Sequence, residues 1–92
     1  MTRTQVRTAV IDALQEAQLA LAGMAQDLPD DANPRDAIQG FDSLATVEVT
    51  TTICVTLGIS KTVRNPFIEN DGNVTVAKVV EAFCTLAGAT EN

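Results

Sequence analysis

The chain has 92 residues, 46% of them hydrophobic and 20% charged, which is typical of one globular domain over residues 1–92 and not of a disordered segment. It contains no histidine, which removes the commonest general base, the Ser-His and Cys-His nucleophile pairs and most zinc sites. Twelve acidic residues against six basic ones give a net charge of −6, so a nucleic acid or an anionic membrane surface would repel the chain.

The first predicted element is an amphipathic helix from Thr4 to about Met24, capped by Thr2 or Thr4. Its apolar residues recur at spacings of three and four: Val6, Val10, Leu14, Ala17, Leu21 and Met24. The other face carries Arg3, Arg7, Asp12, Gln15, Glu16 and Gln18. Because Asp12 and Glu16 interrupt the apolar run that a secretory signal requires, we expect a cytoplasmic protein.

Residues 26–41 read as a long ordered loop. Two runs of turn and helix-breaking residues occur in it, Leu28-Pro29-Asp30-Asp31 and Asn33-Pro34-Arg35-Asp36. We expect three apolar side chains to hold this loop against the core: Leu28, Ile38 and Phe41.

The second main helix is predicted from Asp42 or Ser43 to Leu57, with Gly58 as the residue that ends it. At about 100° per residue, Thr46, Val49, Ile53 and Leu57 form one stripe, which we expect to pack into the core. Leu44, Val47 and Val55 lie roughly opposite, with Glu48 and Thr51 between them. So small a domain cannot easily bury both sides, so we expect an exposed apolar patch near Ser43; the alternative is that the long loop covers it.

After a short connection over residues 60–64, Asn65-Pro66 predicts an N-cap and a one-turn helix through Glu69. Residues 70–73 read as a turn, and a last helix runs from about Thr75 to Gly88, followed by a frayed tail over residues 89–92. The predicted fold class is therefore all-α: a four-helix bundle of three main helices and one short one, with a long loop between the first and second.

Cys54 and Cys84 are the only cysteines and form no C-x-x-C pattern, so we expect buried, reduced thiols.

No stretch of the sequence is long enough to span a membrane, and we expect no stable membrane insertion. The paired acids Asp30 and Asp31 lie in a turn-rich region and are interpreted as solvated, so no metal site is predicted. With no histidine and no close Ser/Lys or Asp/Glu constellation, no catalytic residues are predicted and we expect a protein that is not an enzyme.

Ser43 is the candidate functional residue. A serine in the first turn of a helix presents its hydroxyl beside unpaired backbone N–H groups and the positive end of the helix dipole. That position suits a phosphate ester. Because no catalytic apparatus accompanies it, Ser43 is predicted to be an attachment point and not a nucleophile.

The chain resembles the acyl carrier protein family. The resemblance lies in the run Gly40-Phe41-Asp42-Ser43-Leu44-Ala45-Thr46-Val47-Glu48, in Leu57-Gly58-Ile59 near the end of the same helix, and in Thr75-Val76 at the start of the last helix. The order of the elements extends the likeness over essentially the whole chain. The resemblance implies an acyl-carrier-like bundle with 4′-phosphopantetheine on Ser43, transferred from coenzyme A by a separate magnesium-dependent phosphopantetheinyl transferase.

The arm would hold an acyl group as a thioester, on which acyl-loading, condensing and acyl-transfer enzymes act in a fatty-acid, lipid or polyketide pathway, with the carrier as a monomer. Asp42 would help to place the phosphate or its metal ion, or serve as a plain N-cap. The partner-binding residues implied are Leu44, Val47, Glu48, Thr51 and Val55, with Glu48 attracting an Arg or Lys of the partner.

Some positions depart from the family pattern. The serine-headed helix has only Glu48 after Asp42, where typical fatty-acid carriers have several acids, and Gln39 stands where leucine is common. Ala77-Lys78 replaces the usual Gly-Asp after Thr75-Val76. Because long-range steering depends on charge, these departures favour a specialised carrier of a dedicated pathway that docks by more apolar contacts.

Two alternatives remain from the residues. An aminoacyl or peptidyl carrier of a nonribosomal pathway would keep the arm and change the cargo, but such carriers tend to read G-G-x-S-L where this chain has Phe41-Asp42-Ser43-Leu44. A helical interaction module of the same fold would have no arm at all.

Overall fold

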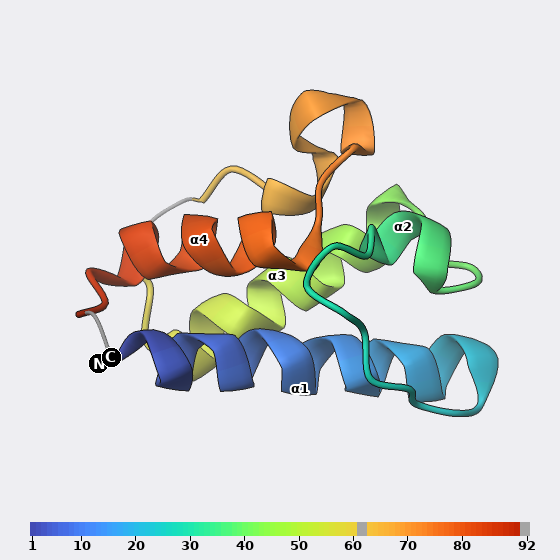
Figure 1. Ribbon diagram of the computed structural model, residues 1–92, viewed down its shortest axis with the longest axis horizontal. Helices are drawn as coiled ribbons and strands as arrows, with labels where there is room; N and C mark the ends of the chain where they lie inside the picture. The colour runs from blue at the N-terminus through green and yellow to red at the C-terminus, as the bar shows by residue number, and fades with distance from the viewer. Residues whose placement is uncertain (61–62, 91–92) are drawn as a thin grey trace.

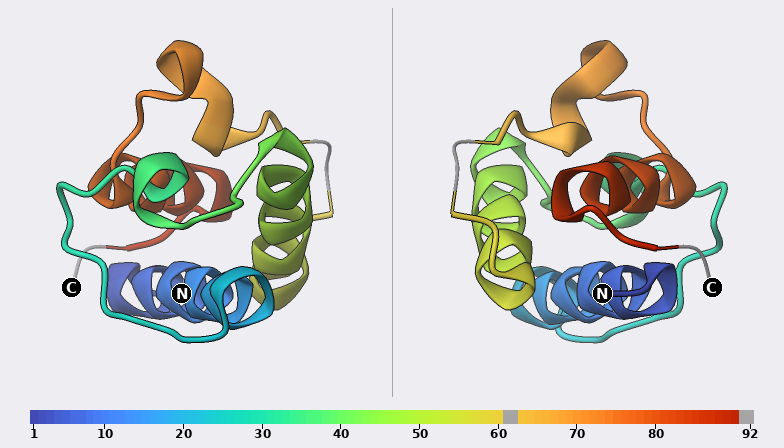
Figure 2. Two further views of the ribbon diagram at one scale, coloured as in Figure 1. Left: turned by 90° about the vertical axis from the view of Figure 1, so that its right-hand side faces the viewer. Right: turned by 90° about the vertical axis from the view of Figure 1, so that its left-hand side faces the viewer.

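The computed structural model describes residues 1–60 and 63–90, and the elements in them are helical (Figure 1). They are the α-helices α1 (Arg3–Ala22), α2 (Pro34–Ala37), α3 (Ser43–Leu57) and α4 (Val76–Ala87), and the 3₁₀-helix η1 (Pro66–Gly72). α1 packs against both α3 and α4. η1 lies on the side of the molecule opposite α1, with α4 between them (Figure 2). The predicted small helical bundle is confirmed. Among the described helices, none combines the length and the apolar character needed to cross a bilayer.

α1 begins and ends close to its predicted bounds. Thr2 Oγ1 accepts a hydrogen bond from Gln5 N, and Gln5 Oε1 accepts one from Thr2 N, which together form a capping box. The helix ends at Gly23, whose φ of +79° is a left-handed conformation that glycine adopts without strain. The prediction of the apolar face is wrong for Leu21 and Met24, which are both exposed. Leu21 lies in the last turn of α1, and Met24 follows the glycine that ends the helix.

Gln18 was also predicted wrongly, on the solvent face of α1. It is buried, and its Oε1 accepts a hydrogen bond from Gln26 N in the following loop. Its Nε2 has no hydrogen-bond partner among the described residues. The loop thus folds back over α1 and covers this glutamine.

The long loop contains one helical turn that the sequence analysis did not predict. Asn33 Oδ1 accepts from Arg35 N at 3.0 Å and Pro34 begins the four-residue helix α2. Asn33 Nδ2 also donates to the Gly72 carbonyl at 2.9 Å, which joins α2 to η1. The expected anchors are confirmed, since Ile38 and Phe41 are buried and Leu28 packs against the core.

The helices after α3 begin at the predicted caps. Asn65 Oδ1 accepts from Phe67 N at 2.9 Å, and Thr75 Oγ1 accepts from Lys78 N at 3.2 Å. η1 continues to Gly72, so the prediction of a turn over residues 70–73 is wrong for its first three residues. The predicted fraying is wrong for residues 89–90, because Thr90 N donates to the Met1 carbonyl and Arg3 N to the Thr90 carbonyl. Residues 91–92, and residues 61–62 of the connection after α3, lie outside the described residues.

The core is built mainly from small aliphatic side chains around the three phenylalanines. Phe41 and Phe67 contact edge to face, with ring centroids 5.5 Å apart, and Phe83 is fully buried. Phe41 therefore anchors the residues that lead directly into α3. This fixes where the first turn of α3 begins.

Candidate functional site

Ser43 is the first residue of α3, and its side chain is exposed. The chain reaches it through Gly40, whose φ of +82° turns the backbone, and through the buried Phe41. Asp42 is the N-cap of α3, and its Oδ1 accepts from Ala45 N at 2.9 Å. The sequence thus places a hydroxyl in solvent directly after an anchored residue and a capped helix start.

The electrostatics of this end of α3 come from the backbone and from one carboxylate. An α-helix leaves its first N–H groups without partners in the helix, and the carboxylate of Asp42 accepts one of them. The sequence has no basic residue between Asp36 and Ser60. An anion attached at Ser43 would therefore meet the first-turn N–H groups of α3 and no basic side chain from α3 itself.

A buried hydrogen-bond network fixes the first turn of α3 to the start of η1. Thr46 Oγ1 donates to the Ser43 carbonyl at 2.6 Å, and Asn65 Nδ2 donates to Thr46 Oγ1 at 2.8 Å. Thr50 Oγ1 donates to Asn65 Oδ1 at 3.2 Å. Because Thr46 is fully buried and Thr50 nearly so, these bonds replace water that the hydroxyls lose on folding.

This network was not predicted from the sequence, although Thr46 was expected on the inner stripe of the helix and Asn65 at a helix cap. Thr46 and Thr50 are one turn apart, and a helical threonine can donate its hydroxyl to a carbonyl of its own helix, as Thr46 does to Ser43. The available signal was only that buried hydroxyls are hydrogen-bonded, and it did not identify Asn65 as the partner of both.

The predicted partner-binding residues lie together on one exposed side of α3. This outer face, as it is called below, consists of Leu44, Val47, Glu48, Thr51 and Val55, all of them exposed. Leu44 is 68% exposed and Val55 76%, so the alternative that the long loop covers this face is wrong. The loop instead directs its apolar side chains into the core. An exposed apolar patch is the usual mark of an interaction surface.

Cys54 and Cys84 are both free thiols, as predicted. Cys84 is buried as predicted, whereas the prediction of a buried thiol is wrong for Cys54, which is only half-buried at the margin of α3. Burial raises the pKa of the Cys54 thiol above its ordinary value, because desolvation disfavours the thiolate. In the part of the chain that the structure describes, no three metal-ligating side chains lie together.

Comparison of the sequence with protein-family models, and of the chain with curated proteins and solved structures, finds no match. The interpretation of the site therefore depends on its own residues: an exposed hydroxyl at a capped helix start, beside an exposed apolar face.

Proposed function

We propose that this protein is an acyl carrier protein, with 4′-phosphopantetheine attached to Ser43 and acyl groups held on that arm, in a specialised fatty-acid, lipid or polyketide pathway. The observation that supports this most is the exposed position of Ser43 as the first residue of α3. A modifying enzyme can approach this hydroxyl from solvent.

The residues around Ser43 fit a phosphate ester. The first-turn N–H groups of α3 point toward the helix start and can stabilise the negative charge. The Asp42 side chain accepts from Ala45 N, so one carboxylate oxygen is directed into the helix start. The arm would supply a terminal thiol that forms a thioester with the acyl group.

The attachment step requires an outside enzyme. A bond would form between Ser43 Oγ and the phosphorus of coenzyme A that bears the pantetheine, while the bond from that phosphorus to the nucleotide phosphate breaks. The nucleotide leaves as adenosine 3′,5′-bisphosphate, and the serine proton passes to a base. That base would belong to the transferase, because the neighbouring carboxylate of Asp42 already accepts from Ala45 N as the cap of α3.

The outer face of α3 would be the main docking surface for the transferase and for the acyl-loading, condensing and acyl-transfer enzymes. Leu44 and Val47 lie within the first two turns after Ser43 and are exposed, so they would make apolar contacts beside the arm. Glu48 would pair with a basic side chain of the partner.

The experiment is incubation with coenzyme A, Mg²⁺ and a phosphopantetheinyl transferase of broad specificity, followed by intact mass measurement. We expect a gain of one phosphopantetheine group in the protein with its native Ser43 and none in the Ser43→Ala variant. Ser60, which is exposed after α3, is the only other serine, so Ser60→Ala is a matched control that should gain the full mass.

Absence of any mass gain in the protein without substitutions would contradict the carrier function and favour an interaction module without an arm. Mass analysis of the cargo on protein isolated from its native host separates the two carrier classes. An acyl group supports the proposal, and an aminoacyl or peptidyl group supports the nonribosomal alternative.

A further inference from the structure

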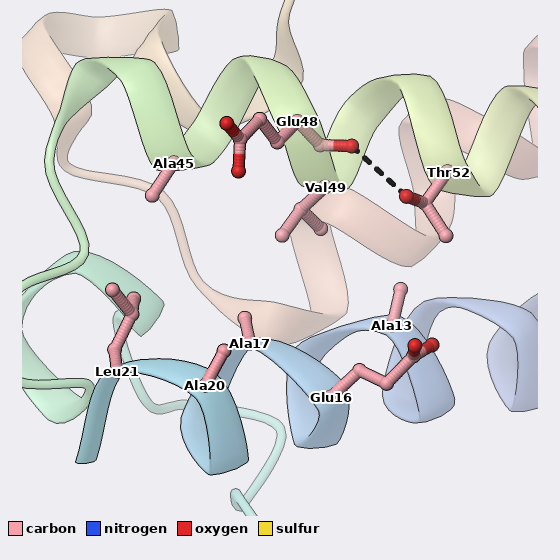
Figure 3. Close-up of a pocket in the computed structure, with 9 residues that line it drawn as sticks. All are labelled: Ala13, Glu16, Ala17, Ala20, Leu21, Ala45, Glu48, Val49 and Thr52. Atoms are coloured by element: carbon pink, nitrogen blue, oxygen red, sulfur yellow. Dashed lines mark hydrogen bonds between the residues drawn. The ribbon is translucent and has the colours of Figure 1, made fainter.

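A groove runs between α1 and α3, close to the outer face. It has a volume of about 180 Å³ (Figure 3). Its walls carry short side chains, among them Ala13, Ala17 and Ala20 from α1 and Ala45 from α3. Thr52 Oγ1 donates to the Glu48 carbonyl, so its hydroxyl is already satisfied. The two helices thus pack together without filling the space between them, and the space stays open to solvent.

The volume of the groove limits the kind of group that can occupy it. Pockets for drug-sized ligands have volumes of roughly 300–1,000 Å³, whereas a cavity of about 150 Å³ holds a molecule the size of benzene. At about 180 Å³ the groove fits one aliphatic side chain and not a long acyl chain. A protein segment that sits across the groove is therefore the occupant that its volume favours.

The charges on the groove are all negative. Glu16 from α1 and Glu48 from α3 stand on opposite walls, both exposed, and the lining includes no basic side chain. Within residues 1–60 and 63–90, neither carboxylate takes part in an ion pair. On the α4 side of α1, by contrast, Arg3 pairs with Glu81. Two carboxylates beside an apolar floor repel an anion and attract a cation.

We propose that the groove binds a basic amphipathic segment of a partner protein, which seats one aliphatic side chain among the alanines and places Lys or Arg side chains near Glu16 and Glu48. This rests on the proposed carrier function and extends the docking surface from α3 onto α1. It also supplies a second acidic group for docking, because α3 itself carries only Glu48 after its cap.

The test uses a synthetic amphipathic helical peptide as the probe, with one Leu flanked by Arg residues one turn away on each side. Titration of the peptide into the 92-residue protein is followed by amide chemical shifts in NMR. We expect the largest shifts at groove residues, such as Ala17 and Ala45. Glu16→Gln and Glu48→Gln should each weaken binding by about two- to fivefold, the range for exposed ion pairs, and the loss should shrink at high salt.

Three controls make the result decisive. Asp31→Asn removes an exposed carboxylate from the loop between α1 and α2, outside the groove, and should leave the affinity unchanged. A peptide with Gln in place of Arg should bind more weakly. Ala20→Leu adds volume at an exposed position of the groove wall and should also weaken binding, since it occupies the seat of the Leu side chain.

The proposal is overturned if the shifts lie elsewhere, if Asp31→Asn weakens binding as much as Glu16→Gln, or if the Gln peptide binds equally well. Ser43→Ala should bind the peptide as the unmodified protein does. Failure of the groove and failure of the carrier function are therefore distinguishable, because the peptide test does not depend on modification of Ser43.

Discussion

The two sides of α3 have similar composition and opposite surroundings. The inner side buries Thr46, Val49, Thr50 and Ile53, two of which carry hydroxyls. The outer face exposes three apolar residues, Leu44, Val47 and Val55, beside Glu48 and Thr51. Polarity alone therefore does not decide which side of this helix faces the core. The hydroxyls are tolerated inside because Asn65 pairs with them, and the apolar residues outside have no role in the core.

The largest difference in stability between the two sides should appear on removal of apolar volume. Ile53 is fully buried and Val55 is 76% exposed. We expect Ile53→Ala to lower the free energy of unfolding by about 2–5 kcal/mol, because it removes buried methyl groups and leaves a cavity. Val55→Ala should change it by less than about 0.5 kcal/mol. Urea unfolding monitored by circular dichroism measures both.

Equal losses from these two substitutions would show that the outer face is covered in solution, by a second copy of the chain or by a rearranged loop. Repeating the measurement at several protein concentrations distinguishes these cases, because only association makes stability depend on concentration.

The next difference should come from the hydroxyls. Thr46→Val removes the Oγ1 that accepts a hydrogen bond from Asn65 Nδ2, so the Asn65 amide is left with an unpaired donor. We therefore expect the free energy of unfolding to fall by about 1–3 kcal/mol. Thr51 donates only to the Val47 carbonyl of its own helix and is exposed, so Thr51→Val should change it by less than about 0.5 kcal/mol. Because both substitutions replace Thr by Val, any difference between the two losses reports the surroundings of the hydroxyl and not the change of side chain.

The matched variant Asn65→Ala should lower stability together with Thr46→Val in a non-additive way, since both residues belong to one network. Strict additivity of the two losses in a double-mutant cycle would contradict the direct Thr46–Asn65 bond.

The two sides of α3 could be predicted from the sequence because they depend on local periodicity. The 100° repeat separated Thr46 and Ile53 from Leu44 and Val55, and the structure confirms that division. The bounds of α3 were also predictable, because Asp42 caps one end and Gly58 ends the other.

Other features that depend on contacts between distant segments were not predicted, unlike the loop anchors Ile38 and Phe41. Gln18 is buried only because the loop returns to it, and Glu16 stands opposite Glu48 only because α1 packs on α3. α2 is a different case, because Asn33-Pro34 carries the same N-cap and N1 pattern as Asn65-Pro66. We interpreted the first pair as a helix breaker and the second as a helix start, so a usable local signal was missed.

The smallest expected effect concerns Cys54, which lies at the margin between the two sides. Because burial raises its pKa, a smaller fraction is thiolate at a given pH, and alkylation by iodoacetamide should be slower than for an unhindered peptide thiol. The alkylation rate of Cys54 should keep rising as the pH passes the ordinary pKa of a cysteine thiol, because its own pKa is higher. Cys84 is buried and should react only after opening of the fold. Mass spectrometry of digests taken over time assigns each site.

A rate at Cys54 equal to that of the free peptide thiol would show that the margin of α3 is more open than its burial indicates. Unfolding the protein in urea provides the control, since both thiols should then react alike.

Thr2 and Thr90 pair side by side, so the chain closes on itself at one end of α1. α3 begins toward the other end of α1, and the long axis of the molecule measures 32 Å (Figure 1). A fusion partner or a solid support joined through either of these threonines would therefore stand away from the Ser43 hydroxyl. The same adjacency favours circular permutants, in which a short linker joins the two threonine segments.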